Sequence, residues 1–154
     1  FLVISLYHPE FFIQGTPADI ESHPKNYVHR ITRDSNIIFA HGRDPNFSGW
    51  SDTLQLDYRN PNVVQVMQEQ LILAADQCDG VRCDMAMLLG NHIFARTWHG
   101  YFAEDDYPEV EFWDEIIPRV KAEYSDFLFM AEVYWNMEFE LQKLGFDYTY
   151  DKVL

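Results

Sequence analysis

Two short strand-like segments, each ending in a carboxylate, constrain the fold of this chain more than any other feature. The run DGVRCD at residues 79–84 ends in Asp84, and the run FLFMAE at residues 127–132 ends in Glu132. Helix-like segments lie before and between these two runs, so the pattern predicts strands joined by helices. Such alternation indicates a parallel sheet covered by helices, which is an α/β fold.

The remaining helices and strands are predicted from capping residues and apolar spacing. Asn60 followed by Pro61 marks the start of a helix. Its apolar stripe comprises Val63, Met67, Leu71, Ala74 and Cys78. Further helices are predicted at 92–98, 109–124 and 137–144, and strands at 80–87, 127–133 and 146–153. The chain therefore contains about three strand–helix units.

The N-terminal third of the chain carries weaker signals. Residues 1–6 (FLVISL) are apolar enough for a strand. A long irregular stretch follows from Tyr7 to Asp52, in which only residues 36–40 have the pattern of a strand. A loop of this length in a compact domain is usually functional or forms a small subdomain.

Composition and charge restrict the partners. The chain has 154 residues, of which 47% are hydrophobic and 16% aromatic, so there is ample material for a core. The formal net charge of −14 argues against nucleic acid, because phosphate binding requires clustered Lys and Arg. Neutral sugars fit this charge. No apolar run approaches the ~20 residues that span a bilayer, so no membrane partner is expected.

The two cysteines indicate a reduced compartment. Cys78 and Cys83 lack the spacing of a metal or redox motif, and we expect two buried free thiols and a cytoplasmic location. The chain begins at Phe1 without a methionine, which suggests that it starts within a longer protein.

The charged residues of the two runs predict a catalytic pair. Arg82 and Asp84 are two residues apart, so their side chains emerge on the same face of a strand. Neighbouring strands lie ~4.8 Å apart, which could bring Asp84 and Glu132 within the ~5–5.5 Å separation of a retaining glycosidase. On spacing alone, an Arg–Asp pair that braces the sheet beside a solvated Glu132 is an equally good interpretation.

In the catalytic interpretation Asp84 is the nucleophile and Glu132 protonates the leaving oxygen. Arg82 would keep Asp84 ionised, because an adjacent cation lowers the pKa of a carboxyl group. Met130 and Trp135 would provide dry surroundings that raise the pKa of Glu132.

Three more residues are candidates for contact with a sugar. His41 could line the cleft, although an ordinary loop hydrogen bond explains it equally well. Trp50 could stack on a sugar ring, or could pack the long loop against the rest of the domain. Trp135 follows Glu132 closely enough to contact the same substrate.

Four segments, in order, resemble signatures of the alpha-amylase family, glycoside hydrolase family 13. GVRCD at 80–84 resembles the strand-four signature, whose aspartate is the nucleophile, and MAEV at 130–133 resembles the strand-five signature with the acid/base glutamate. WSDTLQLDY at 50–58, followed by Asn60-Pro61, is similar to the run before strand four, and GFDY at 145–148 resembles strand six.

This resemblance implies part of a (β/α)₈ TIM barrel, about strands four to six, preceded by a long irregular loop or small subdomain. We therefore expect a loop or subdomain at 1–52 and a partial barrel domain at 53–154. A complete barrel needs ~250 residues, so the chain is expected to be an incomplete part of the enzyme and inactive alone.

The implied activity is that of a retaining glycoside hydrolase or transglycosylase. Its substrate would be an oligosaccharide or α-glucan with α-linked glucosides, and it would act through a covalent glycosyl-enzyme intermediate. Two alternatives remain: an inactive barrel homologue that serves as a carbohydrate-binding or interaction module, and a standalone α/β binding domain.

Three departures from the family pattern limit what the resemblance implies. The strand-three signature should precede residue 8 and is not found, and the strand-seven His-Asp would lie beyond Leu154. Met87-Leu88 stand where many alpha-amylases have Lys-His, a pair that contacts substrate and helps to bind calcium. We therefore expect no metal and no cofactor, and this departure argues against calcium and against starch endo-amylase activity.

Overall fold

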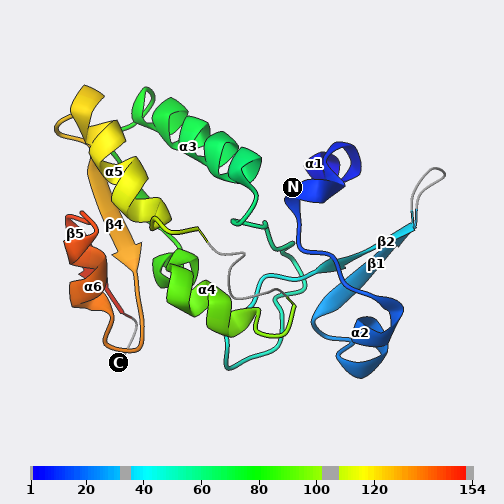
Figure 1. The fold of residues 1–154 in the computed structure, drawn as a ribbon. Coiled ribbons are helices and arrows are strands. Elements are labelled where there is room, and N and C mark those ends of the chain that lie inside the picture. Colours follow the sequence, from blue (N-terminus) through cyan, green and yellow to red (C-terminus); the bar gives the residue numbers. More distant parts are fainter. Residues whose placement is uncertain (1, 32–35, 102–107, 152–154) are drawn as a thin grey trace. The chain divides into compact units, whose positions relative to one another are not determined.

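The computed structural model describes residues 2–31, 36–101 and 108–151 (Figure 1). The chain divides into two compact units, Phe1–Val63 and Val64–Leu154. The predicted division between residues 52 and 53, which assigned the second part to a barrel, stays a prediction.

The first unit contains a two-stranded antiparallel hairpin and short helices. Strands β1 (Tyr27–Ile31) and β2 (Asn36–Ala40) pair with Tyr27 opposite Ala40. The helical segments that precede them are α1 (Leu2–Tyr7), η1 (Pro9–Phe11) and α2 (Pro17–Ser22). The hairpin and the helix α2 replace much of the stretch that was predicted to be irregular.

Two predictions for this unit are wrong for identifiable reasons. Residues 2–7 form a helix, not a strand, because a short run that is apolar throughout has no period that separates the two. Helix α2 was missed although its start is encoded: the Thr16 side chain accepts from the Asp19 amide, and the Asp19 carboxylate accepts from the Thr16 amide. Such a capping box fixes a helix start.

The second unit is built on a three-stranded parallel sheet in the order β3-β4-β5. Its strands are β3 (Gly80–Cys83), β4 (Leu128–Glu132) and β5 (Tyr148–Tyr150). Its helices are η2 (Ala86–Leu89), α4 (Asn91–Thr97), α5 (Phe112–Glu123) and α6 (Glu138–Lys143), together with most of α3 (Pro61–Ala75). These elements confirm the predicted strand–helix alternation, mostly with shorter bounds. Residues 152 and 153 of the predicted last strand lie outside the described residues.

The strands β3 and β4 lie unusually close at their beginning. A Cβ atom added to Gly80 would lie 2.6 Å from the carbonyl oxygen of Leu128, so a larger residue would push the strands apart. At the other end, strand β3 stops at Cys83, earlier than the predicted residue 87. Met85 takes a left-handed backbone conformation with φ 48°, which ends the strand before η2 begins.

One face of this sheet forms the core of the second unit. Phe129, Ala131 and Val133 are fully buried, and ring packing joins Phe129 to Phe146 and Phe146 to Trp113. On the other face of β4, Leu128 is 46% exposed and Met130 39% exposed. Parallel sheets are usually covered on both faces. In the residues that the structure describes, the strands form two small sheets and no closed barrel.

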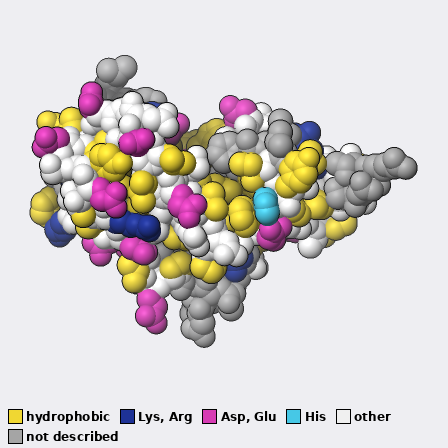
Figure 2. All heavy atoms as spheres, turned by 90° about the horizontal axis from the view of Figure 1, so that it is seen from above, with side chains coloured by type: hydrophobic (Ala, Val, Ile, Leu, Met, Phe, Trp, Pro, Cys, Tyr) yellow, Lys and Arg dark blue, Asp and Glu magenta, His cyan; other side chains and the backbone are white. Residues whose placement is uncertain are grey.

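The surface of the chain is acidic. Figure 2 shows Asp and Glu side chains spread over the face in view, with few Lys or Arg, in keeping with the net charge of −14.

Both cysteines are free thiols, as predicted, but Cys78 is exposed and Cys83 only partly covered. Cys78 lies beyond the end of α3, so it does not extend the buried side of that helix.

Candidate active site

The parallel register gathers charged and phenolic side chains at the carboxyl edge of the sheet. Cys83 pairs with Ala131, so the residues that follow them, Asp84 and Glu132, come next to each other. Glu132 in turn pairs with Tyr150. The carboxyl ends of parallel strands are where α/β folds carry their ligands and chemistry, so this edge is the candidate active site.

Arg82 is the centre of the cluster. Its Nη2 atom lies 2.5 Å from Oε2 of Glu132 and 3.2 Å from Oδ1 of Asp84. Its Nε–H donates to the hydroxyl of Tyr150 at 2.8 Å. The hydrogen bond to Tyr150, aided by the two carboxylates, raises the pKa of Arg82 above its ordinary value. The guanidinium is therefore a permanent cation that joins all three strands.

Glu132 is almost completely buried, with 1% of its surface exposed. Its Oε2 accepts from Arg82, and its Oε1 accepts from the hydroxyl of Tyr134 at 2.8 Å. A buried carboxylate is costly unless it is paired and hydrogen-bonded. The two donors meet that requirement, and they favour the ionised form of Glu132.

Asp84 differs from Glu132 in exposure and in its pKa. Its side chain is 71% exposed, and its pKa is raised. The largest cause is the hydrogen bond that it shares with Glu132, followed by partial burial, and these outweigh the attraction of Arg82. Two carboxyl groups in contact do not readily ionise together.

Arg82 lowers the pKa of Asp84, as predicted, but the contact with Glu132 and partial burial outweigh this effect. The guanidinium lies closer to Glu132 than to Asp84, so the cation chiefly favours the Glu132 carboxylate. Spacing within one strand could not show this, because the competing carboxylate belongs to the neighbouring strand.

The chain leaves both strands through left-handed backbone conformations. Met85 follows Asp84 with φ 48°, and Trp135 and Asn136 have φ 65° and 59°. Non-glycine residues in this region cost of order 1 kcal/mol and cluster at functional sites. Here they turn the chain away immediately after the two carboxylates.

Trp135 lies three residues after Glu132, and the guanidinium of an arginine approaches its ring. The guanidinium of Arg96, on α4, lies 6.0 Å from the ring centre, at the limit of a cation–π contact. Trp135 is 37% exposed and Met130 39%. Both were predicted to keep Glu132 dry, yet both are far more exposed than Glu132 itself.

The other two predicted contact residues belong to the first unit. His41 is 6% exposed, and its Nδ1 lies 2.7 Å from the carbonyl oxygen of Thr53, which is the loop hydrogen bond considered as an alternative. Trp50 is 37% exposed, and its amide donates to the carbonyl of Gly42 at 2.8 Å. Within the second unit the structure brings together Arg82, Asp84 and Glu132.

Sequence reasoning missed the two tyrosines of the cluster. Tyr134 lies two residues after Glu132, and Tyr150 two residues after Tyr148 at the end of the third strand. The alternation of side chains that paired Arg82 with Asp84 also applied to them.

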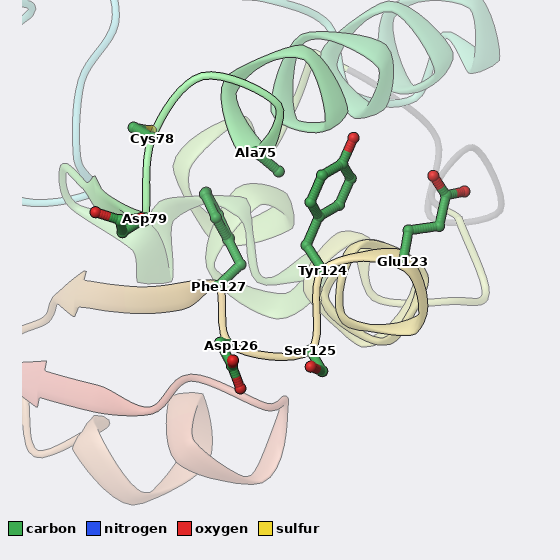
Figure 3. Close-up of a pocket in the computed structure, with 8 residues that line it drawn as sticks. All are labelled: Ala75, Cys78, Asp79, Glu123, Tyr124, Ser125, Asp126 and Phe127. Carbon is green, nitrogen blue, oxygen red and sulfur yellow. The ribbon is translucent and has the colours of Figure 1, made fainter.

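A separate cavity of about 320 Å³ lies at the opposite ends of the same strands (Figure 3). It is lined by Ala75, Cys78, Asp79, Glu123, Tyr124, Ser125, Asp126 and Phe127. These residues lead into β3 and β4, whereas Asp84 and Glu132 lie where those strands end. The cavity is therefore not part of the candidate active site.

Searches for a metal site and for membrane-spanning helices give two further findings. In the described part of the chain, no group of three or more His, Cys, Asp and Glu side chains is arranged to hold a metal ion. Among the helices described, none has the length and apolar character needed to cross a membrane.

No protein-family model and no curated protein matches this chain. Among solved structures it is similar to an alpha-amylase from Lactobacillus plantarum, with 23% identity and a TM-score of 0.48, over 94% of this chain and 24% of that one. It is also similar to a family GH13_31 enzyme, with 19% identity and a TM-score of 0.50, over 75% of this chain and 23% of that one.

The chain thus spans about a quarter of the length of these two structures. At such identities the likeness concerns the fold alone. The similarity to the GH13_31 enzyme indicates that the α/β arrangement of this chain also occurs inside that larger enzyme.

Proposed function

We propose that this chain carries the nucleophile and the acid/base of a retaining enzyme that acts on α-linked glucosides, by hydrolysis or by transfer. One observation carries the proposal: Asp84 and Glu132 lie side by side at the carboxyl ends of adjacent parallel strands, and one nitrogen of Arg82 contacts an oxygen of each. The resemblance of residues 80–84 and 130–133 to family 13 signatures assigns the roles.

The closeness of the two carboxyl groups favours retention over inversion. An inverting pair stands ~6.5–9.5 Å apart to admit a water molecule, whereas a retaining pair stands ~5–5.5 Å apart. Because the same nitrogen of Arg82 contacts an oxygen of Asp84 and an oxygen of Glu132, the two carboxyl groups are too close for the spacing of an inverting pair. Asp84 can therefore reach the anomeric carbon itself.

In the proposed first step, Asp84 attacks the anomeric carbon while the bond to the leaving oxygen breaks. Glu132 gives its proton to that oxygen, leaving a glycosyl ester on Asp84. In the second step, Glu132 takes a proton from water or from a sugar hydroxyl, which attacks the anomeric carbon and releases Asp84. Water and a sugar hydroxyl compete for the same intermediate, so both outcomes use the same residues.

This mechanism requires a redistribution of the proton when substrate binds. The first step needs an ionised Asp84 and a protonated Glu132, but without substrate the Arg82 cation lies closer to Glu132 and the pKa of Asp84 is raised. A shift of the guanidinium towards Asp84 reverses this preference. The side chains of Arg82 and Asp84 are 42% and 71% exposed, so both are accessible from the substrate side.

The test is covalent trapping in the full-length protein. A mechanism-based fluorosugar should label the peptide that contains Asp84, as read by mass spectrometry, and Asp84→Asn should abolish labelling and lower turnover by several orders of magnitude. Asp79→Asn is the matched control, because Asp79 lies at the opposite end of β3. Labelling at another residue would reassign the nucleophile. Absence of labelling and turnover, with sugar binding retained, would indicate an inactive carbohydrate-binding homologue instead.

A further inference from the structure

The hydroxyl of Tyr134 forms a hydrogen bond with one oxygen of the Glu132 carboxyl group. It donates to Oε1 at 2.8 Å, while Arg82 donates to Oε2 at 2.5 Å. The two oxygens of the carboxyl group are therefore distinguished by their donors. Arg82 also reaches Asp84 from the same Nη2 atom, at 3.2 Å, so Oε2 is the oxygen on the Asp84 side of the cluster.

The position of Tyr134 is fixed by the backbone around it. The preceding amide, that of Val133, donates to the carbonyl of Tyr150 at 2.9 Å, which ties this part of the chain to β5. Trp135 and Asn136 then turn the chain in left-handed conformations. The phenol thus approaches Glu132 from a segment that is held on both sides.

The electrostatic surroundings of Glu132 come from three strands. Arg82 and Asp84 belong to β3 and its end, Tyr134 follows β4, and Tyr150 of β5 acts through its hydrogen bond with Arg82. Tyr134 donates to Glu132 directly, whereas Tyr150 acts on Glu132 through Arg82. A donor to a carboxylate favours the ionised form.

We propose that Tyr134 is a positioning residue that orients Glu132 and sets the pH at which Glu132 loses its proton. By holding Oε1, Tyr134 leaves Oε2 as the oxygen that exchanges the proton once Arg82 moves away. The catalytic role of Tyr134 rests on the proposed function, but the effect of its hydrogen bond on Glu132 does not.

The effect can be measured without any activity. Side-chain carboxyl carbons of glutamate are followed by ¹³C NMR against pH in the full-length protein, and the Glu132 signal is assigned by its loss in Glu132→Gln. Tyr134→Phe should move the Glu132 titration to higher pH by about one pH unit, since a hydrogen bond to a buried charge is worth about that much. Tyr148→Phe is the matched control, because Tyr148 is 56% exposed and precedes Tyr150 on the same strand. It should leave the titration unchanged.

Activity provides the second readout. The alkaline limb of the pH profile of kcat/KM should move to higher pH in Tyr134→Phe, with kcat reduced more than KM is changed. If Tyr134→Phe folds poorly, difluorotyrosine at position 134 keeps the shape and strengthens the donor, so the Glu132 titration should move to lower pH instead.

Two results would overturn the proposal. One is an unchanged Glu132 titration in both variants at position 134, and the other is an equal shift in Tyr148→Phe. Failure of the proposed function is recognised separately. If Asp84→Asn leaves turnover intact, the catalytic roles are wrong, whereas the NMR titration still decides what Tyr134 does.

Discussion

Asp147 offers the sharpest test of how the sheet that carries the site is held together. Its Oδ2 accepts from the amide of Phe129 in β4 at 2.8 Å, and its Oδ1 accepts from Nζ of Lys121 in α5 at 2.5 Å. Its own amide donates to the carbonyl of Phe129 at 3.0 Å. Because Asp147 directly precedes β5, this side chain fastens the third strand to the second.

The cost of replacing Asp147 with asparagine follows from these contacts. Asparagine still offers an oxygen to the Phe129 amide, but it loses the charge that strengthens this bond and attracts Lys121. The ion pair is partly exposed, with side chains 28% and 26% accessible, so it contributes at most ~1 kcal/mol. Weakening the charge-assisted bond to the buried amide costs about 1 kcal/mol more. We expect Asp147→Asn to lose about 1–2 kcal/mol of unfolding free energy at pH 7.

The stability lost in Asp147→Asn should become smaller as the pH falls. Partial burial raises the pKa of Asp147, but the hydrogen bonds from Lys121 and the Phe129 amide outweigh it, so the pKa is below its ordinary value. A depressed pKa contributes stability that is present above the unfolded value, ~3.9 for aspartate, and is lost as pH falls through the folded value. The asparagine variant cannot titrate there, so the two stability curves should converge in acid.

Two measurements check this prediction. Urea unfolding at a series of pH values gives the free energies, and hydrogen exchange of the Phe129 amide gives the local effect. Exchange should become roughly 5–30 times faster at pH 7, the factor equivalent to 1–2 kcal/mol. Asp126→Asn is the control, because Asp126 is exposed in the loop before β4. An equal loss in both variants, or a difference that persists unchanged to pH 2, would refute the reasoning.

Three further predictions concern the site and the thiols. Glu132→Ala should slow substrates with poor leaving groups far more than activated aryl glucosides, and azide should restore turnover by replacing the lost base step; equal slowing without rescue would remove Glu132 from the acid/base role. Activity of the full-length protein should survive EDTA, because Met87-Leu88 stand where many alpha-amylases have the Lys-His pair that accompanies calcium; loss in EDTA with recovery in calcium would contradict this. At pH 8 iodoacetamide should modify the exposed Cys78 and spare Cys83, since burial raises the pKa of the Cys83 thiol to about 12; mass spectrometry of the peptides reads the outcome.

The second half of the chain was largely predictable because its local signals agree with one another. The helix at residues 61–75 begins at the proline that follows Asn60, and the strand at residues 128–132 is apolar up to Glu132. Gly145, with φ 106°, follows the helix that it was predicted to end. Where capping, period and composition point to the same element, tertiary contacts only adjust its bounds.

The first unit was harder to predict because its decisive signals are polar and short. Thr16 and Asp19 encode a helix start within a stretch read as irregular. Strand β1 has one buried residue, Tyr27, followed by increasingly exposed ones, so it lacks the apolar alternation that identifies a strand. Its pairing with β2 supplies the missing information, and pairing is a property of two segments that neither shows alone.

The electrostatics of the site illustrate the same limit at the level of single atoms. Side-chain alternation places Arg82 and Asp84 on one face and suggests that the cation serves that aspartate. The register with β4 then sets Glu132 closer to the guanidinium than Asp84 is. The strand pairing, and not the spacing, therefore decides which carboxyl group is the better proton acceptor.

The strand pairing also places two carboxyl groups beside a single cation. Arg82 contacts both Asp84 and Glu132, so the cluster carries one negative charge in excess when both carboxyl groups are ionised. This charge lies beside Glu132, of which 1% is exposed, and burial opposes it. The pKa of Asp84 is accordingly raised, chiefly by its contact with Glu132 and then by partial burial. Under the proposed function a neutral sugar adds no charge to this cluster, whereas an anionic ligand would meet the excess negative charge of the two carboxyl groups.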